Sequence, residues 1–108
     1  MAIILGFDVG GVNTKAAFMR THKGFVTTLK IKVEYFPIWK KGKEQLPSVL
    51  RTLWEQLSSS TTLNAVGATM TAELSDVFFI KREGVIYIIV SLSEVFPTVP
   101  IWILYTDA

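Results

Sequence analysis

The groups in this sequence best suited to chemistry lie in the short stretch 8–15, between two apolar runs near the N-terminus. The stretch contains a carboxylate, two adjacent glycines, an amide, a hydroxyl and an ammonium. In order these are Asp8, Gly10, Gly11, Asn13, Thr14 and Lys15. Glycine lacks a Cβ, can take positive φ and lets backbone N–H groups approach an anion. A carboxylate beside such a loop can hold a hydrated divalent cation that bridges to phosphate oxygens. The stretch therefore predicts a phosphate clamp in which Asp8 also serves as a catalytic and metal-binding residue.

The spacing differs from that of the two commonest phosphate loops. The sequence has no G-x-x-x-x-G-K-[ST], and its glycines at 6, 10 and 11 do not form G-x-G-x-x-G before a helix. A strand, a turn and a second strand fit better, with Ile3–Phe7 before the loop and Ala16–Met19 after it. The alternative is a tight hairpin whose glycines serve only turn geometry and whose polar side chains face water. The flanking Asp8 and Lys15 favour the clamp.

A second polar stretch follows the apolar segment Ala65–Thr71, which becomes polar at its C-terminal end. Ligands bind α/β sheets at the carboxyl ends of their strands. The hydroxyls of Thr69 and Thr71 are suited to a phosphate or substrate, and Glu73 or Asp76 to activating a nucleophile or holding a cation. Alternatively, Thr71 caps a helix and the two carboxylates favour its N-terminus electrostatically. Spacing alone leaves both interpretations open.

Two further features bear on chemistry. Lys81 and Arg82 form either an anion-binding pair or the solvated start of a helix. His22 lies in a polar turn and is expected to be solvated. The chain has no cysteine, which excludes disulfides, thiolate catalysis and cysteine zinc sites.

Composition narrows the class of protein. Half of the 108 residues are hydrophobic, enough for a covered sheet in a single domain. The net charge of +2 comes from scattered basic residues, which argues against nucleic acid as a partner. The apolar run Val85–Val90 is far too short to span a membrane, and no basic region precedes an apolar leader, so we expect a cytoplasmic location.

Hydrophobic patterns give the elements that must position these groups. Phe25–Val33 alternates, which predicts a strand with a half-buried aliphatic face and with Lys30 and Lys32 on a solvated face. Apolar residues at helical spacing predict a helix over 46–57. Val85–Val90 has strong β propensity, but the spacing after it favours a helix, and periodicity does not decide between them. Ile101–Tyr105 is expected to be a buried strand.

The predicted order is three strands, a helix, a strand, a helix and a strand, with right-handed crossovers between the parallel strands. This order predicts an α/β fold of the ribonuclease H-like kind. A three-stranded antiparallel meander is extended by parallel strands, and helices cover the sheet faces.

The first loop resembles the first phosphate motif of the actin, hexokinase and Hsp70-like superfamily. Taken together, the stretches 4–17, 67–76 and 81–85 resemble the hydantoinase/oxoprolinase-related proteins linked to tetrahydromethanopterin C1 metabolism. That group includes an archaeal enzyme of methanofuran biosynthesis, which joins an aminomethylfuran diphosphate to γ-glutamyltyramine and releases pyrophosphate.

The resemblance implies a phosphorylated small molecule and Mg²⁺ at the two loops, with either an organic diphosphate or ATP as ligand. Asp8 and Asp76 would hold the metal, Lys81 and Arg82 would neutralise a diphosphate, and Glu73 would act as the base. Members of the group are roughly three times as long and carry a second lobe. Residues 1–108 would then be a first lobe, and another polypeptide or a second copy of the chain would complete it. The chain would be a fragment, a truncated enzyme or half of a split enzyme. Two other functions stay open, namely an ATP-dependent kinase, ATPase or amidohydrolase lobe and a non-catalytic interaction module.

Overall fold

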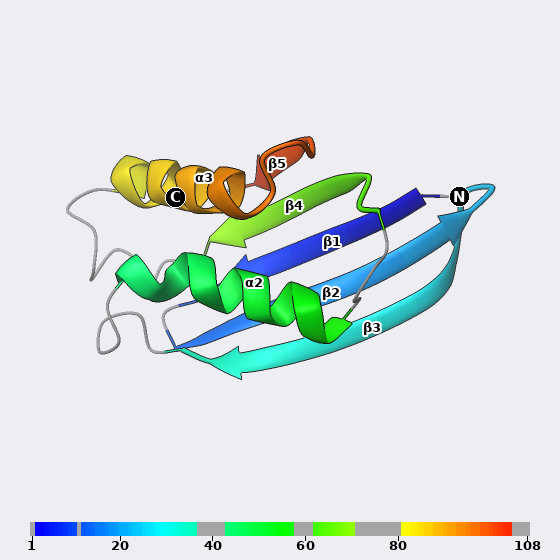
Figure 1. The fold of residues 1–108 in the computed structure, drawn as a ribbon, viewed down its shortest axis with the longest axis horizontal. Helices are drawn as coiled ribbons and strands as arrows, with labels where there is room; N and C mark the ends of the chain where they lie inside the picture. The colour runs from blue at the N-terminus through cyan, green and yellow to red at the C-terminus, as the bar shows by residue number, and fades with distance from the viewer. Residues whose placement is uncertain (1, 11, 37–42, 58–61, 71–80, 105–108) are drawn as a thin grey trace.

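In the part of the chain that the computed structural model describes, a five-stranded mixed sheet carries two α-helices on one of its faces (Figure 1). The structure describes residues 2–10, 12–36, 43–57, 62–70 and 81–104, with the backbone alone at 43, 81–83 and 104. The elements in chain order are β1 (Ala2–Val9), β2 (Asn13–His22), β3 (Phe25–Tyr35), the 3-10 turn η1 (Lys43–Gln45), α2 (Leu46–Leu57), β4 (Ala65–Met70), α3 (Lys81–Val95) and β5 (Ile101–Leu104).

The sheet has the strand order β3-β2-β1-β4-β5, so β1 lies at its centre. β1, β2 and β3 form an antiparallel meander, and β4 and β5 extend it as parallel strands. The predicted order of elements and the predicted α/β fold class are both confirmed, but the two described helices cover one face of the sheet and not both. None of the helices in the part of the chain described is long and apolar enough to cross a membrane.

The run that periodicity left undecided is the helix α3. Val85, Ile88 and Leu92 are buried at spacings of three and four residues, while Ile86 and Val90 are exposed. That pattern is the inward stripe of a helix, because a strand would bury every second residue. The β-branched residues of this run are compatible with a helix because tertiary packing overrides a propensity difference of this size.

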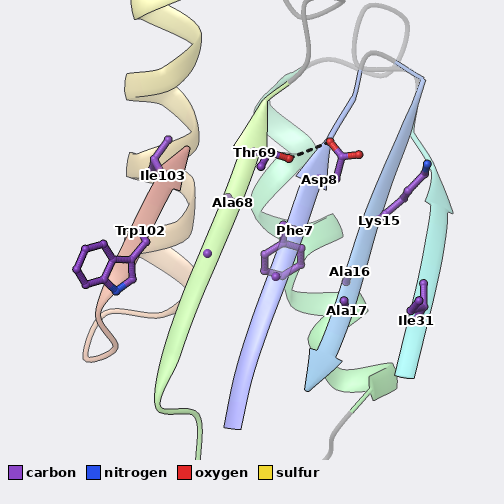
Figure 2. A pocket seen from close by; sticks show the side chains of 12 residues that line it. Phe7, Asp8, Lys15, Ala16, Ala17, Ile31, Ala68, Thr69, Trp102 and Ile103 are labelled. Carbon is purple, nitrogen blue, oxygen red and sulfur yellow. Dashed lines mark hydrogen bonds between the residues drawn. The ribbon is translucent and has the colours of Figure 1, made fainter. Parts of the chain in front are cut away.

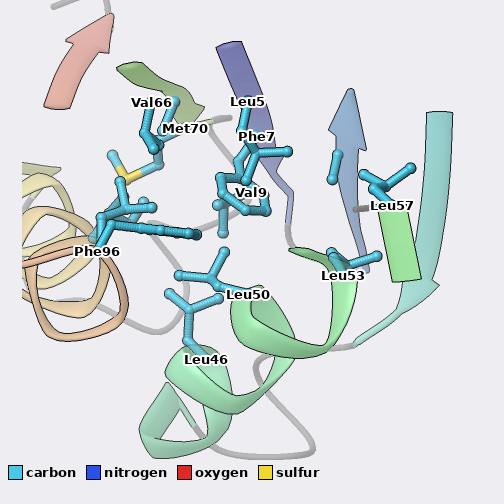
Figure 3. Close-up of a cluster of buried hydrophobic side chains, with 14 of the residues drawn as sticks. Leu5, Phe7, Val9, Leu46, Leu50, Leu53, Leu57, Val66, Met70 and Phe96 are labelled. Carbon is cyan, nitrogen blue, oxygen red and sulfur yellow. The ribbon is translucent and has the colours of Figure 1, made fainter. Parts of the chain in front are cut away.

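The core lies between the sheet and its two helices (Figure 3). Every second residue of β1 is buried, from Ile3 to Val9, and α2 buries the predicted leucine stripe. Aromatic rings join the layers, since the ring centroid of Phe96 lies 6.1 Å from that of Phe7 on β1 and 6.3 Å from that of Trp54 on α2. The sheet and both helices therefore share one hydrophobic core.

The expected orientation of β3 was wrong. Ile31 and Val33 are 63% and 52% exposed, because they lie on the sheet face that neither helix covers. Lys30 is opposite Phe18 on the helix-covered face, where its Nζ sits 5.4 Å from the ring centroid. Alternation shows which residues share a face but not which face is covered. We call the face that carries Lys15, Ile31 and Val33 the bare face.

Candidate functional site

A hydrogen-bonded pair forms where β1 and β4 end (Figure 2). Asp8 and Thr69 are directly opposite each other in the parallel pairing of these strands, and the Thr69 hydroxyl donates to Asp8 Oδ1 at 3.1 Å. The pair is partly buried. Because parallel strands end at the same edge of a sheet, two stretches that are 61 residues apart in sequence meet here. The bond fixes the carboxylate and occupies one of its two oxygens.

Lys15 lies on the other side of Asp8. It is opposite Asp8 in the antiparallel pairing of β1 with β2, and its exposed side chain is on the bare face (Figure 2). Asn13, the first residue of β2, is also exposed. A carboxylate, a hydroxyl, an ammonium and an amide therefore gather at one end of three neighbouring strands.

The loop backbone differs from the expected clamp. Gly10 donates its N–H to the carbonyl oxygen of Asn13 at 3.0 Å, so this donor closes the hairpin instead of facing a ligand. Positive φ occurs in the described chain at Lys23 and Gly24, in the turn between β2 and β3, and not at Gly10. Gly11 lies outside the described residues.

Thr14 points away from the other polar groups of the loop. It pairs with Val9, is fully buried on the helix-covered face, and its Oγ1 finds no hydrogen-bond partner among the residues described. The strand alternation that sends Lys15 to the bare face sends Thr14 into the core. Its hydroxyl is therefore not brought together with Asp8 and Lys15.

For the other predicted site residues, the structure describes the backbone alone or nothing. Thr71, Glu73 and Asp76 lie outside the described residues. Lys81 and Arg82 begin the backbone of α3, as expected of a helix start. Within the described ranges no three acidic or histidine side chains come together as metal ligands.

Sequence reasoning missed a hollow of about 630 Å³ that lies on the bare face beside the Asp8 and Thr69 pair. Gly6, Ala17 and Gly67 contribute to its lining, together with Ile31 and Trp102 (Figure 2). Gly6 and Gly67 are opposite each other, and a Cβ on Gly6 would meet no atom within 4 Å. Two glycines inside apolar strands were the available signal, since such glycines often mark a close approach of a ligand or another backbone.

The expectation of a buried strand at 101–105 was wrong in part, because Trp102 is 72% exposed.

Comparison with known proteins relates the sequence to one synthase and the fold to several solved structures. No protein-family profile matches the sequence. The chain is 36% identical over 94 residues to the (4-{4-[2-(gamma-L-glutamylamino)ethyl]phenoxymethyl}furan-2-yl)methanamine synthase of Methanocaldococcus jannaschii. The match covers 87% of this chain and 25% of the synthase, so the chain spans about a quarter of that relative.

Several solved structures have a similar fold. The Aquifex aeolicus Ppx/GppA phosphatase superposes with a TM-score of 0.64 at 11% identity, over 97% of this chain and 36% of the phosphatase. YeaZ from Pseudomonas aeruginosa gives 0.57 at 16% identity, over 97% and 44% of the two chains. RuvC from Thermus thermophilus gives 0.55 at 14% identity, over 95% and 63%. The chain has a ribonuclease H-like fold of the kind found in actin-like proteins.

Proposed function

We propose that this chain is the phosphate-binding lobe of a transferase that releases diphosphate, related to the methanofuran-pathway synthase. The observation that carries the proposal is the Thr69 to Asp8 hydrogen bond at the shared carboxyl end of β1 and β4. The 36% identity to the synthase over 94 residues supports it. The expected ligand is the diphosphate end of a small organic molecule.

Each residue of the site has a distinct role in this proposal. Asp8 supplies a carboxylate ligand to Mg²⁺, which usually takes one or two carboxylates and completes its shell with water and substrate phosphates. Thr69 holds that carboxylate in place through its 3.1 Å bond. The Lys15 ammonium stabilises the negative charge that develops on the departing diphosphate. Bound Mg²⁺ would offset the same charge.

The proposed reaction forms an aryl ether and breaks a carbon–oxygen bond to diphosphate. The synthase's name contains a phenoxymethyl group on a furan, which is an aryl ether. We propose that a phenolic oxygen forms a C–O bond to the methylene carbon as the C–O bond to diphosphate breaks. The phenolic proton would pass to Glu73, and Asp76 and Thr71 would complete the metal and phosphate contacts. Lys81 and Arg82 would pair with the leaving group, and a second lobe would close over it.

Calorimetric titration with magnesium pyrophosphate tests the binding role. Asp8→Asn and Lys15→Met should each weaken binding about tenfold to a hundredfold, since a hydrogen bond or ion pair to a charged group contributes about 1.5–3 kcal/mol. Glu55→Gln and Arg51→Met, both on the exposed side of α2, are matched controls. Binding heat with magnesium ATP but not with magnesium pyrophosphate would favour the kinase or ATPase function. Absence of heat with both ligands, from a folded chain, would reduce stretch 8–15 to a hairpin turn.

Thr69→Val isolates the positioning role. It removes the hydroxyl that positions Asp8 but leaves the carboxylate in place, so pyrophosphate affinity should fall about threefold to tenfold, less than on substitution of Asp8 itself. Thr27→Val is the matched control, because that hydroxyl also donates one hydrogen bond, to the Arg20 carbonyl at 3.2 Å, but lies near the opposite end of the sheet. Equal effects from the two variants would contradict the role given to Thr69.

A further inference from the structure

Among the described residues no strand pairs with the outer edge of β3, which carries exposed apolar side chains. β3 is an outer strand of the sheet, and its bare-face residues Leu29, Ile31, Val33 and Tyr35 are all more than half exposed. An unpaired strand edge presents unsatisfied N–H and C=O groups and is a template for pairing with another strand. The combination identifies this edge as a surface for association.

The hydrogen-bond pattern shows which backbone groups of β3 point away from β2. Phe36 donates its N–H to the carbonyl of Val12 at 2.8 Å, in the same register that pairs β2 with β3. In an antiparallel ladder, hydrogen-bonded pairs alternate with non-hydrogen-bonded ones. The even-numbered residues 30–34 therefore bond to β2. The N–H and C=O groups of Ile31, Val33 and Tyr35 point outward.

We propose that two copies of this chain associate edge to edge through β3, in antiparallel orientation about a two-fold axis at Val33. Val33 then faces Val33 of the second copy through a hydrogen-bonded pair. Ile31 faces Tyr35 of the second copy, an aromatic and β-branched pair of the kind that stabilises sheets. The contact is isologous, as expected of a closed dimer.

Charge selects this register over its neighbours. With the axis at Val33, Lys32 is opposite Glu34 of the second copy, and the same pair occurs twice. Moving the axis by one residue puts Lys32 opposite Lys32, or Glu34 opposite Glu34, at non-hydrogen-bonded positions. There the Cα atoms are only about 4.5 Å apart, so like charges are destabilising. Among these three registers, the one at Val33 alone places no like charges directly opposite each other.

Sedimentation of the 108-residue chain over a concentration series, with far-ultraviolet circular dichroism to verify folding, tests the dimer. Lys32→Glu and Glu34→Lys should each raise the dimer dissociation constant about tenfold or more, and the double swap should restore it. Lys30→Glu makes the same change in net charge outside the predicted Lys32 and Glu34 contacts, and should leave association nearly unchanged. A monomer at every concentration, or equal weakening by Lys30→Glu and Lys32→Glu, would overturn the proposal.

Cross-linking tests the axis directly, because the chain has no cysteine of its own. Val33→Cys places two thiols at a hydrogen-bonded pair with Cα atoms about 5.5 Å apart, within the range of a disulfide. Mild oxidation should convert it to a covalent dimer. Leu29→Cys is equally exposed on the same face but faces no cysteine in this register, so it should stay uncross-linked. Cross-linking of Leu29→Cys at the rate of Val33→Cys would refute the register.

Discussion

Thr14 offers a direct test of how strand alternation divides the hairpin between core and site. Its side chain is fully buried and its Oγ1 has no hydrogen-bond partner in the part of the chain described. Burying an unpaired hydroxyl costs about 1–3 kcal/mol in proteins. Thr14→Val keeps the shape and removes that hydroxyl, so we expect the free energy of unfolding to rise by about 1–2 kcal/mol. For a domain of this size the melting temperature should rise by roughly 4–8 °C per kcal/mol.

Urea unfolding followed by circular dichroism measures this change as a higher midpoint at an unchanged slope. Pyrophosphate affinity should not change, since the hydroxyl lies on the opposite face from Lys15. Thr69→Val is the contrasting variant, because its hydroxyl is bonded to Asp8 and its loss should lower affinity without adding stability. A destabilised Thr14→Val protein, or one that no longer binds pyrophosphate, would refute the assignment of Thr14 to the core.

Three further variants test the core, the bare face and the middle of α3 by the same unfolding measurement. Leu50→Ala should cost about 2–5 kcal/mol, because Leu50 is fully buried between α2 and the sheet; a cost below about 1 kcal/mol would contradict that packing. Gly67→Ala should add about 0.4–1 kcal/mol to the free energy of unfolding, since its Cβ would make an ordinary contact with the Trp102 carbonyl oxygen at 3.9 Å; a loss of stability would contradict this. The pKa of Tyr87 is raised from its ordinary 10.0 by burial and then by Glu44 and Glu94, and lowered in part by a hydrogen bond with Ser91. The neutral phenol therefore stabilises the folded state below about pH 10, and the wild type should lose stability relative to Tyr87→Phe as the pH rises above that value. A constant difference up to pH 11 would refute this.

Local patterns predicted the order of elements except over Val85–Val90, where periodicity left helix and strand open. The leucine stripe of α2, the hairpin around the glycine loop and the apolar strand at 65–70 each carry a signal within one segment. The face that β3 presents carries none, because Leu29 and Lys30 alternate in the same way whichever side the helices cover. The bare face depends on where α2 and α3 both pack, which is a tertiary fact.

The candidate site divides in a similar way. Sequence reasoning named Asp8, Lys15 and Thr69, and the register of three strands brings them to one edge. It assigned Thr14 to the same group because neighbours in sequence were treated as neighbours in space, whereas a strand sends consecutive side chains to opposite faces. The hollow beside the site escaped detection because its lining comes from all five strands.

The buried side chains of β1 determine the geometry of the site. Ile3, Leu5, Phe7 and Val9 are all buried, and a slip of β1 by one residue would turn all four toward the bare face and Asp8 into the core. Burial of one such side chain contributes about 1.5–3 kcal/mol, so the slip would forfeit roughly 6–12 kcal/mol. That is comparable to the whole stability of a typical domain. Because β2 and β4 pair with β1 along most of its length, the same burial also holds Lys15 and Thr69 opposite Asp8. Substitutions that loosen this core should therefore weaken phosphate binding even where they touch no polar group.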